Sequence, residues 1–220
     1  DGGNNVLDVV ALVNIVLGGS SQEQLPIWEY VDINPNSIFY DQMVGPNIFN
    51  GNVSVYYFGK AGWSTCRHRF GVLNDMYQEL QSEGYTEISM AGINGFQYLD
   101  NDYHCMICDT PEECSSCDEE RVLPWTQDID DDDGDGIWDD HGADGIPNTN
   151  DLGENDGIPD ETYGDVWDSW DINLRDLIIL DRSSNYIVRI NLTSFNPDPT
   201  ALGECTDNYQ TIKQIIINLY

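Results

Sequence analysis

Basic side chains are scarce in this sequence. Lysine and arginine together number 8, against 40 aspartates and glutamates, which gives a formal net charge of −32. Nucleic acid and anionic membrane surfaces repel such a chain, so both are excluded as expected partners. The sequence also lacks an apolar run of about 20 residues, the length that a membrane-spanning helix needs, so membrane insertion is excluded as well.

The charge needs screening, and bound divalent cations are the obvious means. A hydrophobic share of 40% is nonetheless large enough for a packed core. The cysteines number six, an even count, and in a chain rich in Asp, Asn and Gly they favour an oxidising compartment. We therefore expect an extracellular or cell-surface protein.

Residues 1–19 combine a short acidic loop with an apolar helical pattern. Asp1 and Asp8 fit positions 5 and 12 of a calcium-binding loop. The segment resembles half of a dockerin repeat, a bacterial extracellular calcium module, and the resemblance implies calcium binding at both residues. A plain packing helix is the alternative. Residues 20–52 are predicted to be a linker and lead-in with one or two short strands.

The main domain is predicted to span residues 53–220. It begins with a buried strand over Val53–Phe58, a helix over about 64–82 and a second strand over Thr86–Asn94. This order predicts a βαβ unit with parallel strands, and Ser64 or Thr65 is expected to cap the helix. The later elements are predicted to be a short helix, a hairpin and a terminal helix, over Asp165–Trp170, Asp176–Asp181 with Tyr186–Leu192, and Thr206–Leu219.

The segment from Ala61 to Asn94 carries a family resemblance. Its sequence, AGWSTCRHRFGVLNDMYQELQSEGYTEISMAGIN, resembles the N-terminal thioredoxin-like domain of selenoprotein P and its bacterial redoxin relatives. Ordered matches extend over most of residues 50–192. The resemblance implies an α/β thioredoxin-like fold. It also implies a redox motif in which Cys66 is the second member and Trp63 replaces the first cysteine or selenocysteine.

Cys66 is the candidate catalytic residue. Basic residues lie close to it in the sequence: Lys60, Arg67 and Arg69. A helix start and nearby cations both favour a thiolate. Against catalysis stand the missing partner cysteine and Arg175, which occupies the position where thioredoxin folds place a cis-proline. Two alternatives stay open: a one-cysteine site resolved by glutathione or a partner thiol, or a Cys66 that is inert or paired with Cys205.

A predicted insertion over residues 97–121 contains four cysteines. They follow the pattern C-x2-C-x5-C-x2-C, as Cys105, Cys108, Cys114 and Cys117. Four thiolates at this spacing can hold zinc in tetrahedral geometry. In an oxidising compartment the same residues can instead form two disulfides. The sequence leaves both alternatives open.

A second predicted insertion, over residues 126–164, has a regular acidic pattern. The motif D-G-I-[WP]-[DN] recurs at Asp135, Asp144 and Asp156, and carboxylates at alternate positions around a glycine are typical of calcium loops. The tract resembles thrombospondin type 3 repeats, which implies calcium binding without an EF-hand switch; a solvated acidic loop is the alternative. The predicted ligands are Asp131, Asp133, Asp135, Ile137 (through its carbonyl), Asp139, Asp140, Asp144, Asn148, Asp151, Glu154, Asp156 and Asp160.

These patterns favour an extracellular calcium-binding structural or interaction protein built on a redox-degenerate thioredoxin-like domain. Calcium is the expected cofactor, with zinc as a second candidate. A protein partner or self-assembly is expected, for example within a larger surface assembly. One alternative is an enzyme, a single-cysteine thiol oxidoreductase or peroxidase acting through Cys66. The other is a cargo module that a scaffold carries by the dockerin-like segment.

Overall fold

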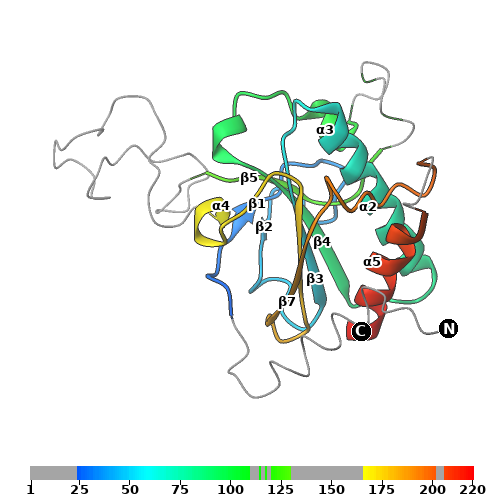
Figure 1. The fold of residues 1–220 in the computed structure, drawn as a ribbon. Coiled ribbons are helices and arrows are strands. Elements are labelled where there is room, and N and C mark those ends of the chain that lie inside the picture. Colours follow the sequence, from blue (N-terminus) through cyan, green and yellow to red (C-terminus); the bar gives the residue numbers. More distant parts are fainter. Residues whose placement is uncertain (1–23, 110–113, 115–116, 118–119, 130–165, 202–205) are drawn as a thin grey trace.

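A five-stranded mixed sheet forms the centre of the domain (Figure 1). The computed structural model describes residues 24–109, 114, 117, 120–129, 166–201 and 206–220. The strands are β1 (Tyr30–Val31), β2 (Met43–Val44), β3 (Val53–Gly59), β4 (Ile88–Asn94), β5 (Trp125–Gln127), β6 (Asp176–Leu180) and β7 (Tyr186–Asn191). The helices are α2 (Ser64–Ser82), α3 (His104–Ile107), α4 (Val166–Ser169) and α5 (Thr206–Leu219), with a 3-10 turn, η1, at Phe96–Tyr98.

The strand order of the sheet is β5-β4-β3-β6-β7. β3 runs parallel to β4, from the pair Val53 and Ile88 to the pair Gly59 and Asn94, and β4 runs parallel to β5. β6 and β7 are antiparallel to their neighbours. The predicted βαβ unit is therefore confirmed, and β3 and β4 end at the same edge of the sheet, beside the start of α2.

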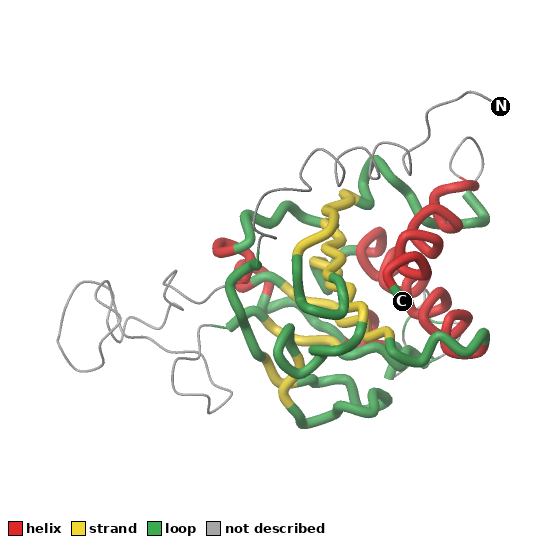
Figure 2. Tube along the Cα trace, turned by 90° about the horizontal axis from the view of Figure 1, so that it is seen from below, coloured by secondary structure: helices red, strands yellow, loops and turns green. Residues whose placement is uncertain are grey.

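Alternate residues of β3 enter two different cores, as the pleat of a strand requires. Val55 and Tyr57 join an apolar cluster with α2 and α5, whereas Tyr56 and Phe58 join one on the opposite face. The two helices accordingly lie on one side of the sheet, with α4 on the other (Figures 1 and 2). β3 and β4 are each buried along their whole length, which explains why both strands consist mostly of apolar residues on both faces.

The face opposite α2 is covered by aromatic side chains of the lead-in and of α4. The ring of Trp28 contacts Tyr56 and Trp170 at centroid distances of 5.2 Å and 6.1 Å. Trp167 of α4 meets Phe58 edge to face at 5.8 Å. The lead-in also supplies β1 and β2, an antiparallel pair, so the predicted short strands of this segment are present.

The sequence predicted most element positions within two residues. Helix α5 has its predicted bounds, and β4 begins at Ile88, two residues later than expected. Strand β5 was not predicted, and Thr126 and Gln127, placed at the start of the acidic insertion, belong to it. Residues 1–19 lie outside the described residues. No helix in the described part of the chain is both long and apolar enough to cross a membrane.

Candidate functional site

The Cys66 thiol lies in the first turn of α2, at the sheet edge where β3 and β4 end. The loop between β3 and α2 is held in place because the backbone N–H of Ala61 donates to Oδ1 of Asn94, at 3.0 Å. Cys66 itself is fully buried. It is the free cysteine among the described residues, while Cys205 lies outside them.

Trp63, not a serine or threonine, is the N-cap residue of α2, and no side chain caps the helix. The expected cap by Ser64 or Thr65 is therefore wrong: the Asn94 contact fixes the loop instead. The first turn carries no acidic residue, so the positive end of the helix dipole is not neutralised by a carboxylate of its own helix. Both features leave the amide dipoles of this turn available to a thiolate at Cys66.

Arg175 brings a guanidinium to the Cys66 sulfur. Its Nη1 lies 3.9 Å from Sγ of Cys66, and its Nε donates to Oγ1 of Thr193 at 2.8 Å. The Arg175 backbone N–H donates to the carbonyl of Phe58 at 2.8 Å, and its carbonyl accepts from Leu192 at 2.8 Å. The sequence suggested that Arg175 marks the loss of an active site, but the structure places its charge beside the thiol.

The backbone of Arg175 is unusual. Its φ of 72° lies in the left-handed region that non-glycine residues rarely adopt. The described chain contains no cis peptide bond, so the cis-proline of thioredoxin folds is replaced here by a trans residue with positive φ. Backbone hydrogen bonds to β3 and to the residue after β7 hold this conformation in place.

Tyr57 contacts the backbone of Cys66 and stays neutral. Its hydroxyl donates to the carbonyl of Cys66 at 3.2 Å. Burial, and secondly the neighbouring Cys66, raise the pKa of Tyr57 well above its usual value. A neutral phenol does not compete for the charge of Arg175, which remains available to the sulfur.

The next turn of α2 adds further charged groups. Arg69 donates to the carbonyl of Leu192 at 3.2 Å, and burial lowers its pKa. Nε2 of His68 lies 2.8 Å from Oδ2 of Asp198. Burial raises the pKa of Asp198, but the contacts with His68 and Thr200 outweigh it and lower the pKa to about 2. Asp198 is therefore ionised at neutral pH and offsets part of the local positive charge.

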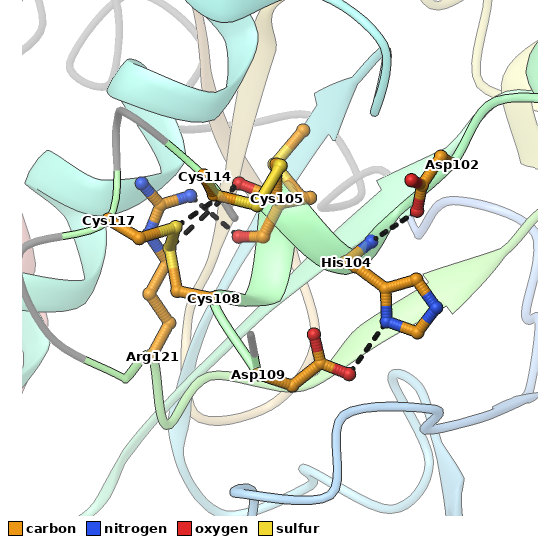
Figure 3. Close-up of a disulfide and its surroundings, with 9 residues drawn as sticks. Asp102, His104, Cys105, Cys108, Asp109, Cys114, Cys117 and Arg121 are labelled. Atoms are coloured by element: carbon orange, nitrogen blue, oxygen red, sulfur yellow. Dashed lines mark hydrogen bonds and ion pairs between the residues drawn. A yellow bond between two sulfur atoms is a disulfide. The ribbon is translucent and has the colours of Figure 1, made fainter. Parts of the chain in front are cut away.

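The four clustered cysteines form two disulfides in the structure (Figure 3). Cys105 pairs with Cys114, and Cys108 pairs with Cys117. Their sulfurs are bonded to each other, so they do not offer the four thiolates of the zinc alternative. The residues between the first two cysteines, Met106 and Ile107, are fully buried in the apolar cluster that contains Cys66.

Arg121 fixes the end of the disulfide-linked insertion. Its Nη1 donates to the carbonyl of Met106 at 2.6 Å, and its backbone N–H donates to Ile107 at 3.2 Å. Burial lowers the pKa of Arg121 to about 10. Nearby, the Nδ1 of His104 contacts Oδ2 of Asp109 at 2.7 Å, as Figure 3 shows. His104 is directed to this carboxylate and away from the sulfurs.

The predicted calcium ligands lie outside the described residues, from Asp131 to Asp160 in the acidic tract and at Asp1 and Asp8. The structure does describe the two ends of the tract. Oδ1 of Asp128 accepts from the backbone N–H of Val166 at 3.0 Å and from the hydroxyl of Tyr30 at 2.6 Å. The tract therefore leaves and re-enters the domain at a single point.

Known structures share this architecture. A thioredoxin peroxidase I from Plasmodium yoelii aligns with a TM-score of 0.55 at 12% identity, over 91% of this chain and 90% of that chain. A SCO1/SenC family lipoprotein from Bacillus anthracis aligns with a TM-score of 0.51 at 8% identity, over 90% and 95%. An uncharacterised conserved protein from Geobacillus kaustophilus aligns with a TM-score of 0.50 at 12% identity, over 90% of this chain and 83% of that chain.

These likenesses, together with the sheet order and the position of Cys66, define the class: the chain has a thioredoxin-like α/β fold. At such low identities they establish the fold alone. No protein-family model matches the chain, and no curated protein matches it in sequence.

Proposed function

We propose that this chain is a single-cysteine thiol peroxidase that acts through Cys66. The observation that carries the proposal is the 3.9 Å separation of Nη1 of Arg175 and Sγ of Cys66 at the start of α2. A thiolate is the reactive form of cysteine, and an adjacent guanidinium and a helix N-terminus both stabilise it. The Plasmodium yoelii structure that shares this fold is a thioredoxin peroxidase, which makes the same reaction class a reasonable proposal for this chain.

The reaction needs only one protein cysteine. The Cys66 thiolate attacks a hydroperoxide oxygen, the O–O bond breaks, and the leaving alkoxide takes a proton, which yields a sulfenic acid and an alcohol. An external thiol then condenses with the sulfenic acid and releases water. A second external thiol breaks the mixed disulfide, so that Cys66 is regenerated and one small disulfide is formed. Two external thiols thus supply the two electrons that reduce the peroxide.

The burial of Cys66 sets a condition on this chemistry. The thiol is fully buried, but Trp63, Ser64 and Thr65 just before it are exposed. Peroxide therefore reaches the sulfur when the first turn of α2 opens, a local motion of the kind that helix ends undergo. The two disulfides are consistent with an oxidising, extracytoplasmic location for this reaction.

Peroxide should convert Cys66 to a sulfenic acid in the native protein. The measurement is intact mass after treatment with hydrogen peroxide and the sulfenic acid probe dimedone, followed by peptide mapping. We expect one adduct, on Cys66, and none in a Cys66→Ser variant. A Cys205→Ser variant is the matched control and should keep the adduct. A Cys66 that stays unmodified at excess peroxide would refute the peroxidase proposal.

A second function is supported by the closure at Asp128. We propose that the acidic tract binds calcium as a module separate from the thiol site. Asp128 is fully buried and accepts a hydrogen bond from Val166, so the two residues that flank the repeats are held together. The repeated D-G-I motif between these ends supplies carboxylates at the spacing of calcium loops.

Calcium titrated by calorimetry should bind with a Kd of about 1 mM or below, the upper end of the range for extracellular calcium modules. Saturating calcium should also raise the unfolding temperature of the tract, and a chelator should reverse the effect. The triple variant Asp135→Asn, Asp144→Asn, Asp156→Asn replaces one expected carboxylate ligand in each repeat by a neutral amide and should weaken binding at least tenfold.

A second triple variant controls for the loss of three negative charges in the ligand variant. It replaces three exposed carboxylates of the described surface, as Glu29→Gln, Asp100→Asn, Asp171→Asn. This variant has the same net charge as the ligand variant, so equal calcium affinity in the two would show that calcium is only a diffuse counter-ion. Peroxide reactivity at Cys66 is measured independently, which keeps the two proposals separable.

A further inference from the structure

Several cations in the described part of the chain lie around the start of α2 with no carboxylate within ion-pairing distance. Arg182 pairs with Glu87, Arg189 with Asp176, and Lys213 with Glu79 and Glu83. In the described part of the chain, no carboxylate lies within ion-pairing distance of Lys60, Arg67 or Arg175. With acidic residues in fivefold excess, unpaired cations on a shared surface are unexpected unless a ligand neutralises them.

Aromatic rings contact two of these cations beside the start of α2. Nζ of Lys60 lies 4.5 Å from the ring centroid of Tyr98 and 4.9 Å from that of Trp63. The guanidinium of Arg175 lies 5.9 Å from the Trp63 ring. Trp63 is 48% exposed although it is a large apolar residue. A ring that contacts two cations and is open to solvent presents both an apolar and a cationic contact to a ligand.

Arg67 extends the same surface along α2. Its backbone N–H donates to the carbonyl of Trp63 at 3.0 Å, so the two residues lie one helical turn apart on the same face. We call Lys60, Trp63, Arg67 and Arg175 the cationic surface. The charged groups next to it in the described chain include Arg69, Arg121 and the His68–Asp198 pair, whose carboxylate offsets one of the neighbouring positive charges. Counted over the described residues, the cationic surface therefore has a net positive charge.

We propose that the cationic surface binds the carboxylate groups of the small thiol or disulfide that exchanges with Cys66. This inference rests on the proposed function and assigns the class of its reducing substrate. A small molecule is favoured over an acidic protein because the sulfur is buried and a protein thiol would have to penetrate the first turn of α2. At about 0.1 M salt the Debye length is about 10 Å, so the local cations outweigh the distant acidic surface for a ligand at this site.

Exchange with disulfides of different charge measures this preference directly. In each reaction the Cys66 thiolate attacks RSSR, forms the mixed disulfide and releases RS⁻. The probes are dithiodipropionate, a dianion; hydroxyethyl disulfide, which is neutral; and cystamine, a dication. Each rate is divided by the rate of the same probe with 2-mercaptoethanol, and a Cys205→Ser background leaves Cys66 as the thiol outside the described disulfides.

The dianion should react about tenfold faster than the dication at low salt, and 0.5 M sodium chloride should remove most of the difference. The net charge of −32 alone would give the opposite order. A double Lys60→Gln, Arg67→Gln variant should abolish the preference, whereas Arg182→Gln, which removes one positive charge elsewhere, should keep it.

The possible results distinguish the proposal for the cationic surface from the peroxidase proposal. A reactive Cys66 that prefers the dication, or a preference that the double variant leaves intact, overturns the cationic surface as the binding site and leaves the peroxidase proposal standing. A Cys66 that reacts with none of the three probes and with no peroxide overturns both. In a Cys66→Ser variant, a change in tryptophan fluorescence on adding S-methylglutathione, reversed by salt and absent when Trp63→Phe is added, provides a binding readout that does not depend on reactivity.

Discussion

Replacing Arg175 by glutamine should lower the rate at which peroxide oxidises Cys66 by about a hundredfold. The guanidinium lies 3.9 Å from the sulfur, where it stabilises the thiolate and the negative charge that develops on the leaving oxygen. Loss of one preorganised donor of this kind typically costs about 100-fold to 1,000-fold in rate, and a hundredfold loss corresponds to about 2.7 kcal/mol. Quenched-flow oxidation followed by mass spectrometry measures the rate.

The size of this effect follows from how firmly Arg175 is held. Its backbone hydrogen-bonds to Phe58 and Leu192, and its side chain hydrogen-bonds to Thr193. The charge is therefore in place before peroxide arrives, and no reorganisation is needed during the reaction. Arg175→Lys keeps the charge but loses the planar fork, so it should show an intermediate rate.

Arg182→Gln is the matched control for the Arg175 variant. Arg182 pairs with Glu87 at 2.7 Å, and its Nε also donates to the carbonyl of Gly51, away from the thiol. It should therefore keep the wild-type oxidation rate. If Arg175→Gln oxidises as fast as this control, the guanidinium is a structural contact only, and the peroxidase proposal loses the observation on which it depends.

The sequence predicted the fold well where its patterns were local. The apolar runs of β3 and β4 and the helical face between them depend on neighbouring residues, and the structure has all three elements. Strand β5 has only the residues Trp125–Gln127 and no alternating pattern of its own. It exists because it pairs with β4, and a contact between distant segments leaves little trace in such a short run.

One sequence feature does point to β5 in retrospect. A Cβ atom at Gly92 would lie 2.4 Å from Cε3 of Trp125, so the indole packs against β4 only because residue 92 is a glycine. A glycine inside a strand pattern often marks such a close approach. The glycine alone does not identify which distant residue approaches it, and that information comes from the strand order.

The candidate site was predictable only in part, because some of its contacts join residues that are far apart in the sequence. Cys66 and its basic neighbours on α2 are visible in the sequence, but Arg175 is more than 100 positions away and meets the thiol because β6 pairs with β3. The cysteine pairing was also undetermined, since four cysteines allow three connectivities. The turn of α3 places Cys105 and Cys108 side by side, and each meets the partner nine positions along the chain.

Removing both disulfides should lower the free energy of unfolding by about 4 kcal/mol. Each bridge closes a loop with a sequence separation of 9, and the chain-entropy relation gives about 2.5–3 kcal/mol for a loop of this length. The two loops overlap, so their contributions add incompletely. For a chain of this size the loss corresponds to a fall in Tm of about 10 °C. Calorimetry of a variant with alanine at all four positions measures it.

A Cys66→Ala variant is the control, because it also removes a buried sulfur but breaks no bridge. Intact mass under denaturing conditions provides a second check: reduction should add about two protons per bridge. No mass change on reduction, combined with stabilisation by added zinc, would contradict the disulfides and restore the zinc alternative. Both observations can be made on the wild-type protein.

Loss of the two disulfides should also make the Cys66 thiol more accessible to reagents. Met106 and Ile107 are anchored between the bridged cysteines and belong to the same apolar cluster as Cys66 and Phe70. Once the bridges are gone, this segment detaches at lower cost, and the first turn of α2 loses part of its cover. Alkylation of Cys66 by iodoacetamide should therefore speed up in the four-alanine variant. An unchanged rate would show that access to the buried thiol depends on Trp63 and the helix start, and not on the disulfide-linked insertion.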